Sequence, residues 1–355
     1  MTKGTHIDQL QTPVAIIDED VMDANIKVVQ RYFDEIGRSF RPHIKTHKIP
    51  ALARKQVEAG AIGINCQKIS EAEVFANAGF NDILITFNML GDDRLARLKA
   101  LNDRVGLQVV ADNEVVVRAL ASTFAKNAPL KVLVECDTGA GRNGVQSPED
   151  ALALALKINA EEGLTFHGLL TYPKANTEDA VEAFFSKTIS LLKEQGLACP
   201  VVSHGGSPSL LDSHLVKSAT EHRAGTYIFN DRAMVRAGLC DFDDCAMHVV
   251  ATVVSRPTET RAVLDSGSKA LTSDLLGFED YGHVVDYPEA SITALSEEHA
   301  VVDLSKCSKK PEIGERLRII PNHTCVVSNL YDQLVFHKSG HVSAVETVAA
   351  RGCVT

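Results

Sequence analysis

Residues 130–144, LKVLVECDTGAGRNG, join a short apolar run to a glycine-rich loop, and similar units recur along the chain. The run is the fifth of eight predicted β-strands, most of them separated by amphipathic stretches such as 114–125 and 178–195. The eight predicted strands are residues 39–44, 61–66, 82–86, 105–110, 130–136, 164–171, 201–203 and 219–223. Eight strands that alternate with helices predict an α/β fold. The specific architecture that they indicate is a parallel (β/α)8 barrel of the TIM type. A doubly wound open sheet has a similar rhythm, and the count of eight favours the barrel.

The pattern changes after Cys240, where helical periodicity largely disappears and glycine and proline separate short β-rich segments. These segments are residues 247–256, 261–265, 299–303, 316–320 and 333–337. They predict a second, mostly antiparallel β domain, which the segment 12–18 joins because it precedes the barrel strands. We therefore expect a barrel domain at residues 18–238 and a β domain made of residues 1–17 with 239–355.

The composition is that of an ordinary globular protein, with 45% hydrophobic and 23% charged residues. A net charge of −10 with scattered basic residues argues against nucleic acid as a partner. The eight cysteines are spread without a CxxC pair, which favours a reducing compartment. No apolar run approaches the ~20 residues needed to cross a bilayer, and the first residues lack the apolar core of a signal peptide. We expect a cytoplasmic protein that does not contact a membrane.

Lys45 lies directly after the first predicted strand, in the segment RPHIKTHK of residues 41–48. Barrel enzymes carry their chemistry at the carboxyl ends of the strands. The neighbouring His43, His47 and Lys48, together with partial burial, favour the neutral amine that attacks aldehydes. On position alone, however, a solvated loop lysine is the favoured interpretation.

Two loops after the last two predicted strands are typical of phosphate sites. They are HGGSPS (204–209) and RAGTY (223–227). Their glycines let backbone N–H groups approach an anion closely, and Ser207 adds a hydroxyl donor. Phosphate sites are frequent after strands seven and eight of this barrel. Arg142, in the glycine-rich loop after strand five, could hydrogen-bond an acidic ring oxygen, although a surface arginine is equally consistent with its position.

The segment PNHTC (321–325) in the predicted β domain contains two metal-ligand side chains, His323 and Cys325. We expect both on one face of a strand, because side chains alternate with a period of two. Imidazole and thiolate are both good zinc ligands. Two ligands do not complete a structural site, but they leave positions open for water and substrate. The His-x-Cys spacing by itself is usually accidental.

Taken together, these segments resemble the D-threonine aldolase and D-serine dehydratase family, whose fold is that of the alanine racemases. The resemblance runs from about residue 12 to the end of the chain. Its most specific segments are RPHIKTHK (41–48), NCQKISEAE (65–73), DTGAGRNGV (137–145), GLLTYP (168–173), EHRAGTYIFND (221–231), DSGSKALTSD (265–274) and PNHTC (321–325).

The resemblance implies that pyridoxal phosphate is held as a Schiff base on Lys45. It places Gln67 near the cofactor, Arg142 at its ring oxygen and Tyr172 at the end of strand six. The implied cofactor-binding set is completed by Ser207, Arg223, Gly225, Thr226 and Tyr227. His323 and Cys325 would hold a divalent metal, zinc or manganese, that coordinates the β-hydroxyl of a small D-amino acid. The family also implies a homodimer.

Two reactions fit this set of residues: retro-aldol cleavage and dehydration. D-threonine aldolases carry a histidine base shortly after the strand-six tyrosine, whereas this chain has PKANTE at 173–178. His-x-Cys also leans toward the dehydratases, while TYP (171–173) and HRAGTYIFND (222–231) resemble bacterial proteins grouped with the aldolases. We favour a lyase of the D-threonine aldolase type. The alternative is a D-serine or 3-hydroxy-D-aspartate dehydratase, in which Lys45 would take the α-proton.

Three further alternatives stay open. An amino-acid racemase on the same fold would use Lys45 and a tyrosine such as Tyr281 or Tyr331, but the metal pair would then lack a purpose. A pyridoxal-phosphate carrier without catalysis would not need the β domain. A cofactor-free barrel aldolase would use Lys45 directly.

Overall fold

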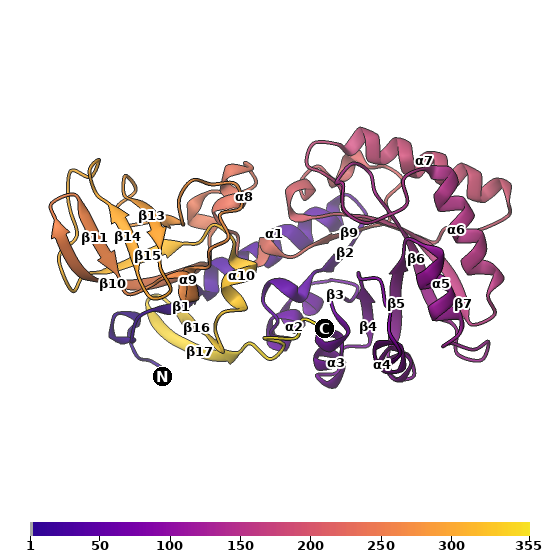
Figure 1. The fold of residues 1–355 in the computed structure, drawn as a ribbon, viewed down its shortest axis with the longest axis horizontal. Coiled ribbons are helices and arrows are strands. Elements are labelled where there is room, and N and C mark those ends of the chain that lie inside the picture. Colours follow the sequence, from indigo (N-terminus) through magenta and orange to yellow (C-terminus); the bar gives the residue numbers. More distant parts are fainter. Residues whose placement is uncertain (1–2) are drawn as a thin grey trace. The chain divides into compact units, whose positions relative to one another are not determined.

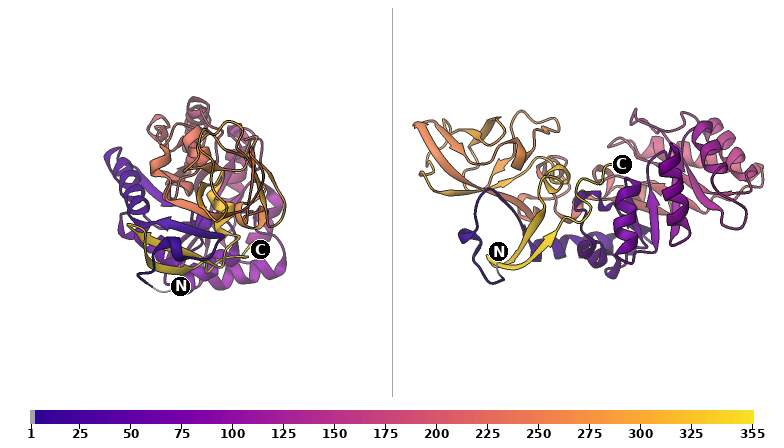
Figure 2. Two further views of the ribbon diagram at one scale, coloured as in Figure 1. Left: turned by 90° about the vertical axis from the view of Figure 1, so that its left-hand side faces the viewer. Right: turned by 60° about the horizontal axis from the view of Figure 1, so that its bottom comes forward.

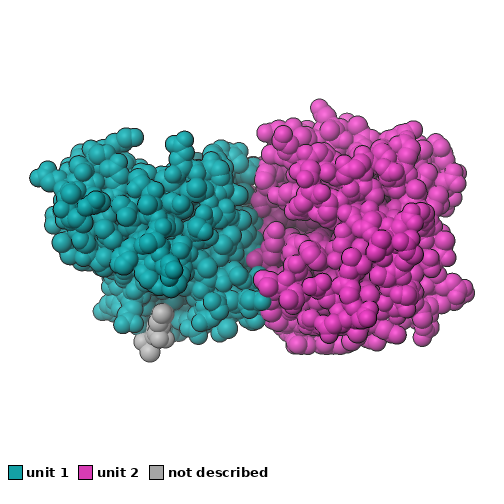
Figure 3. Space-filling model, in the orientation of Figure 1, with its two compact units in different colours: residues 1–28, 46–51, 226–352 teal, residues 29–45, 52–225, 353–355 magenta. Residues whose placement is uncertain are grey.

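The computed structural model describes residues 3–355 as two compact units (Figures 1 and 3). The first, called the barrel unit below, consists of residues 29–45, 52–225 and 353–355. The second, called the β unit, consists of residues 3–28, 46–51 and 226–352 among those described. The chain therefore passes between the units several times, and each unit is assembled from segments that are distant in the sequence.

Eight parallel strands form the sheet of the barrel unit, and each of the eight predicted strands is present. They are β2 (Ser39–Pro42), β3 (Ile64–Cys66), β4 (Asp82–Ile85), β5 (Gly106–Ala111), β6 (Leu130–Cys136), β7 (Leu164–Thr171), β8 (Val201–His204) and β9 (Glu221–Ala224). Their order is β2-β9-β8-β7-β6-β5-β4-β3, and a parallel bridge between His43 and Asn65 links β2 to β3. The predicted barrel is confirmed.

Helices connect most of these strands and lie outside them (Figures 1 and 2). They are α2 (Pro50–Glu58), α3 (Ile69–Asn77), α4 (Asp92–Asn102), α5 (Glu114–Ala121), α6 (Pro148–Ala160) and α7 (Glu178–Glu194), while α1 (Glu19–Glu35) precedes β2 and belongs in part to each unit. Side-chain caps begin two of them: Asn113 accepts from the Val116 N–H, and Ser147 accepts from the Asp150 N–H. After β8 the connection contains only the 3-10 turns η3 (Ser207–Ser209) and η4 (Ser213–Leu215).

Paired charges and apolar side chains fill the barrel below its carboxyl ends. Arg41 bonds Asp82 at 2.6 Å and Glu221 at 3.3 Å, so its buried guanidinium is neutralised on two sides. Leu84 lies two residues beyond Asp82, on the same face of β4, and packs in a cluster with Val110, Leu133 and Leu170. These side chains occupy the interior of the barrel, and enzymes with this fold carry their chemistry beyond it, in the loops that follow the strands.

The β unit is built on a mostly antiparallel nine-stranded sheet. Its strands are β1 (Val14–Asp18), β10 (Met247–Thr258), β11 (Arg261–Leu264), β12 (His283–Val284), β13 (Ser291–Leu295), β14 (Ala300–Asp303), β15 (Arg316–Ile320), β16 (Gln333–Lys338) and β17 (His341–Thr347). The predicted segment 12–18 supplies β1, which pairs antiparallel with β10 and parallel with β16. The sequence pattern did not reveal β12, β13 or β17.

Short helices interrupt the β unit: α8 (Arg232–Arg236), α9 (Ser268–Leu271) and α10 (Thr324–Ser328). The last of these corrects the prediction that His323 and Cys325 lie on one strand, since β15 ends at Ile320. The chain turns into α10 because the buried carboxylate of Asp231 accepts the Thr324 N–H at 3.1 Å. Across residues 3–355, no helix is both long enough and apolar enough to cross a membrane.

Candidate active site

Lys45 lies half-buried in the 3-10 turn η2 (Ile44–Thr46), which directly follows β2. The imidazole of His43 is 3.1 Å from the Gln67 Oε1, and the Gln67 Nε2 donates to the Thr86 carbonyl at 2.8 Å. Burial lowers the pKa of His43 well below its ordinary range, and the charges of Lys45 and Arg223 lower it further. His43 is therefore neutral at physiological pH. The structure brings three predicted cofactor residues (Lys45, Gln67 and Arg223) around this imidazole.

Arg223 is fully enclosed at the carboxyl end of β9. Its Nε donates to the Ser203 hydroxyl at 2.8 Å, and its Nη2 donates to the Thr171 carbonyl at 2.5 Å. Burial lowers the pKa of Arg223 to about 10, although the charges of Glu221 and Glu135 oppose this shift. Arg223 thus stays a cation at neutral pH and is held by hydrogen bonds to residues of two neighbouring strands, β7 and β8.

Glu135 is a buried acid next to this arginine that the sequence interpretation did not single out. Its Oε2 accepts from the Asn143 Nδ2 at 2.6 Å, and its Oε1 is 3.9 Å from the Arg142 Nη2. Burial raises the pKa of Glu135 to about 7, although Arg223 and Arg142 oppose the shift. Glu135 therefore ties β6 to the loop that follows it and to both arginines.

Arg142 and Tyr172 lie together at the rim of the barrel unit. The Arg142 guanidinium stands 4.6 Å from the centroid of the Tyr172 ring, a cation–π contact. Asp112, which directly follows β5, anchors the same loop, because its Oδ2 accepts the Gly144 N–H at 2.9 Å. Arg142 itself contacts Glu135 on β6 and Tyr172, which directly follows β7.

The glycine loop after β8 has no room for side chains. A Cβ atom on Gly205 would lie 2.5 Å from the Arg223 carbonyl oxygen, and its φ of +140° already favours glycine. A Cβ on Gly206 would lie 2.8 Å from the Tyr172 ring. Backbone N–H groups here can approach an anion without interference, and Ser207 follows as the first residue of η3. This loop fits the phosphate site that the sequence predicts.

The second predicted phosphate loop is divided between the units. Gly225 closes the barrel unit, and Thr226 and Tyr227 open η5 (Thr226–Ile228) in the β unit. Tyr227 is buried. The Thr226 hydroxyl is 3.7 Å from the Cys325 Sγ, a contact that the sequence did not suggest.

His323 and Cys325 are close to one another although they do not share a strand. His323 is the N-cap residue of α10, and Cys325 is in its first turn. Burial lowers the pKa of His323, but a hydrogen bond with Cys325 and the Asp274 carboxylate outweigh burial and raise it to about 9. Within the described residues, no group of three or more His, Cys, Asp or Glu side chains could bind a metal.

Three residues near these sites were not identified from sequence: Glu135, Asp274 and Thr46. Glu135 could have been noticed as a charged residue inside the apolar run VLVEC. Asp274 ends the characteristic segment DSGSKALTSD, and Thr46 follows Lys45, but no spacing rule links either of them to His323 or Cys325. Their proximity arises only from the fold.

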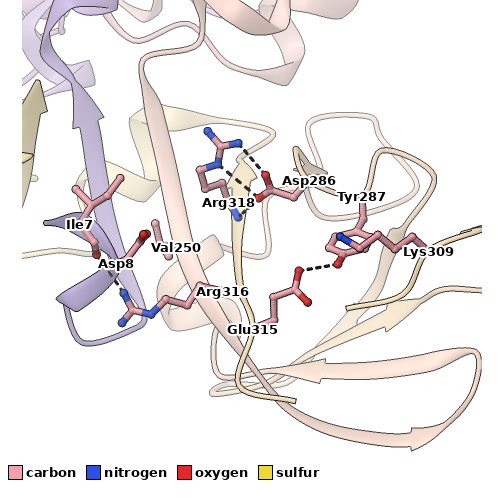
Figure 4. A pocket seen from close by; sticks show the side chains of 9 residues that line it. All are labelled: Ile7, Asp8, Val250, Asp286, Tyr287, Lys309, Glu315, Arg316 and Arg318. Atoms are coloured by element: carbon pink, nitrogen blue, oxygen red, sulfur yellow. Dashed lines mark hydrogen bonds and ion pairs between the residues drawn. The ribbon is translucent and has the colours of Figure 1, made fainter. Parts of the chain in front are cut away.

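The β unit contains a cavity of about 420 Å³, and Figure 4 labels the residues that line it. Its polar groups are largely paired with one another. Arg318 bonds Asp286 at 2.7 Å, and the Tyr287 hydroxyl donates to Glu315 at 2.6 Å. None of the predicted site residues lines it. We therefore do not assign chemistry to this cavity.

Replacing Glu135 with glutamine is expected to make stability less dependent on pH. A carboxyl whose pKa is raised to about 7 on folding binds more protons in the folded state than in the unfolded state. Stability is therefore lost as the pH rises from the ordinary glutamate value of about 4.3 toward 7, by roughly 2–3 kcal/mol between pH 5 and pH 8. Thermal unfolding measures the effect. The difference in Tm between the variant and the wild type should shift in favour of the variant when the pH is raised from 5 to 8. A Tm difference that stays the same at both pH values would contradict the raised pKa of Glu135.

Two family models match the chain. The model described as "Alanine racemase, N-terminal domain" matches residues 17–233, and the model described as "Putative serine dehydratase domain" matches residues 246–337. Among curated proteins, a D-threonine aldolase from Arthrobacter sp. is 33% identical over 98% of this chain and 95% of its own length. A D-threo-3-hydroxyaspartate dehydratase from Delftia sp. is 32% identical over 89% of this chain and 91% of its own length.

Solved structures show the same relationship. A D-threonine aldolase from Filomicrobium marinum has a TM-score of 0.92 and 29% identity, with 100% of both chains covered. A cysteine-to-alanine mutant of a D-threo-3-hydroxyaspartate dehydratase in the metal-free form has a TM-score of 0.86 and 30% identity, over 97% of this chain and 99% of that one. An alanine racemase from Clostridium difficile has a TM-score of 0.71 at 13% identity and shows a shared fold alone, over 96% of this chain and 100% of that one. The predicted alanine racemase-like fold is confirmed.

Proposed function

Because this chain belongs to the family of the D-threonine aldolases and D-serine dehydratases, we propose that it is a pyridoxal-phosphate- and metal-dependent lyase for β-hydroxy-D-amino acids. The main proposed reaction is retro-aldol cleavage of the D-threonine type, which releases glycine and an aldehyde. The observation that carries the proposal is the gathering of Lys45, Gln67 and Arg223 around the neutral imidazole of His43.

The residues of the barrel unit fit pyridoxal phosphate. Lys45 would hold it covalently through Nζ, and the closely packed Gly205 and Gly206 leave backbone N–H groups free of side-chain obstruction for its phosphate. Ser207, Gly225, Thr226 and Tyr227 would complete the phosphate contacts. Tyr172 and the cations Arg142 and Arg223 would bind and orient its ring.

The donor set in the β unit fits a divalent metal such as zinc or manganese. His323 and Cys325 would supply imidazole and thiolate. When bound, the metal would act as a Lewis acid on the β-hydroxyl of the substrate. Two protein ligands leave coordination positions that a substrate oxygen can occupy.

Pyridoxal phosphate, when bound, supplies an electron sink for the electron pair released at the substrate α-carbon. Which bond of the substrate breaks then depends on the base that the protein supplies. Retro-aldol cleavage needs a base for the hydroxyl proton. Dehydration needs a base for the α-proton, and Lys45 could take that proton at Nζ once the substrate has replaced it. The absence of a histidine at residues 173–178 and the presence of Cys325 favour dehydration as the second candidate reaction.

Product analysis distinguishes the two reactions. Incubation with D-threonine and manganese or zinc is expected to yield glycine and acetaldehyde, while L-threonine is left unchanged as the stereochemical control. The formation of 2-oxobutanoate and ammonia, or of pyruvate from D-serine, would instead establish the dehydratase. The absence of products from D-threonine, D-serine and 3-hydroxy-D-aspartate would refute both assignments.

We also propose two domains for this protein. They are a cofactor-binding barrel at residues 18–238 and a metal-binding β domain formed by residues 1–17 and 239–355.

We further propose that the protein is a cytoplasmic homodimer. Family membership supports the dimer, and the scattered cysteines support a reducing compartment. Light scattering of the purified enzyme is expected to give twice the mass of one chain, and a monomer would contradict the proposal.

A further inference from the structure

The two proposed metal ligands are each hydrogen-bonded by polar side chains from other segments of the β unit. We propose that Asp274, together with Thr46 and Thr226, forms an outer hydrogen-bonding shell that orients His323 and Cys325 for metal binding. Asp274 acts in this shell as a positioning residue and not as a ligand. The proposal rests on the metal-binding role of His323 and Cys325 given above.

Asp274 selects the nitrogen through which His323 binds. Its Oδ2 lies 2.8 Å from the His323 Nδ1. A carboxylate only accepts hydrogen bonds, so Nδ1 carries a proton toward Asp274, and the metal would bind at Nε2 in place of the proton there. Metal-binding histidines almost always donate their second ring N–H in this way.

The Asp274 carboxylate is itself held in place. Its Oδ1 accepts the Leu276 N–H at 3.1 Å, while the other oxygen receives His323. Two flanking non-glycine residues have left-handed backbones, with φ of +65° at Thr272 and +47° at Leu276. Such conformations are costly, most of all for a β-branched threonine, and they cluster at functional sites. The turn is strained on both sides of the carboxylate that it presents.

Cys325 is approached by two hydroxyl groups. The Thr46 Oγ1 lies 3.1 Å from the Cys325 Sγ, and the Thr226 Oγ1 lies 3.7 Å from it. Both hydroxyls can donate to a thiolate, the form in which cysteine binds metal. Thr46 follows Lys45 in the chain and Thr226 follows Gly225, so the segments predicted to bind the cofactor also support the thiolate.

This outer shell compensates for the small number of ligands. A structural zinc site fixes its geometry with four protein ligands, whereas a two-ligand site lacks that constraint. Hydrogen bonds on the far side of each ligand fix the imidazole tautomer and the rotation of both side chains. The protein can thus hold a metal firmly while leaving positions for substrate oxygens.

Cobalt binding to the full-length enzyme tests the proposal without substrate. The protein is stripped with a chelator and titrated with Co²⁺, and the thiolate-to-cobalt absorption band reports binding. Asp274→Ala is expected to weaken Co²⁺ binding by about 10- to 100-fold, as loss of an outer-shell partner typically does. Asp274→Asn, whose amide oxygen can still accept from Nδ1–H, should stay within a few-fold of the wild type.

Asp332→Ala is the matched control, because Asp332 is an exposed aspartate of the β unit whose carboxylate pairs with Arg351. It should bind Co²⁺ as the wild type does. Thr46→Val, which removes the hydroxyl while preserving shape, is expected to weaken binding several-fold. It keeps the proposal testable if Asp274→Ala does not fold.

Three results would overturn the proposal. An equal loss of Co²⁺ affinity in Asp274→Ala and Asp274→Asn would indicate that Asp274 is a metal ligand. Unchanged Co²⁺ affinity in both variants would show that Asp274 has no role in metal binding. Unchanged Co²⁺ binding in His323→Ala and Cys325→Ala would refute the metal site in the proposed function as well. A different outcome is that Co²⁺ binding is weakened in Asp274→Ala and preserved in Asp274→Asn while none of the hydroxyamino acids reacts. That combination would support the outer shell and refute only the proposed reaction.

Discussion

Replacing Lys45 with alanine is expected to abolish turnover, with a loss of at least about 10³-fold in kcat, and to remove the visible absorption of lysine-bound pyridoxal phosphate. Lys45 is the amine at the carboxyl end of β2, and its charge is felt by the His43 imidazole that also contacts Gln67. The substitution removes both the covalent link to the cofactor and the group that could move the α-proton. Absorption spectra and product assays of the purified variant measure the two effects separately.

Lys193→Ala provides the control, since Lys193 is an exposed lysine in the last turn of α7. It should retain the spectrum and activity of the wild type. A Lys45→Ala protein that still shows the absorption band would place the covalent link on another lysine. A wild-type protein without the band that still cleaves D-threonine would favour the cofactor-free aldolase.

Removing the metal is expected to have the second largest effect. Chelator treatment, or the double replacement His323→Ala with Cys325→Ala, should lower lyase activity by about 10²–10³-fold, since a Lewis acid contributes several kcal/mol to such a reaction. The cofactor spectrum should persist, because the covalent link to the pyridoxal phosphate would be made by Lys45 and by neither of the two metal ligands. Activity assays before and after re-addition of manganese or zinc measure the effect.

The result also separates the lyase from the racemase. A racemase on this fold would keep its activity in the presence of chelator, because it needs only a base on each face of its cofactor. Metal re-addition should restore the stripped wild type but not the double variant. Cys199→Ala, which removes a half-buried thiol of the barrel unit, should behave as the wild type throughout.

The strands of the barrel could be predicted because each is a short apolar run bounded by turn residues. All eight were found, and the bounds of β6 and β7 matched the prediction. The β unit was less predictable. Strands β12 and β13 contain few buried apolar residues, and they are recognised in the structure by their pairing with β15 and β14. Two residues such as His283–Val284 are too few to show the alternation of apolar and polar side chains by which a strand is recognised.

The prediction that His323 and Cys325 share a strand was wrong for a related reason. The alternation rule applies only where the chain remains extended, and the chain stops being extended after Ile320. The helix that follows depends on Asp231, which is 93 residues away from Thr324 in the sequence. Local spacing contains no information about such a contact.

The sequence by itself determined the barrel, the family and the types of residue that can hold a cofactor and a metal, because apolar periodicity and ordered motifs are local properties of the chain. Only the tertiary structure decided which groups surround those residues. It placed the buried Glu135 beside Arg142 and brought Asp274 to the Nδ1 atom of His323. Contacts of this kind depend on how distant segments pack, and packing sets the burial and charge that control each side chain.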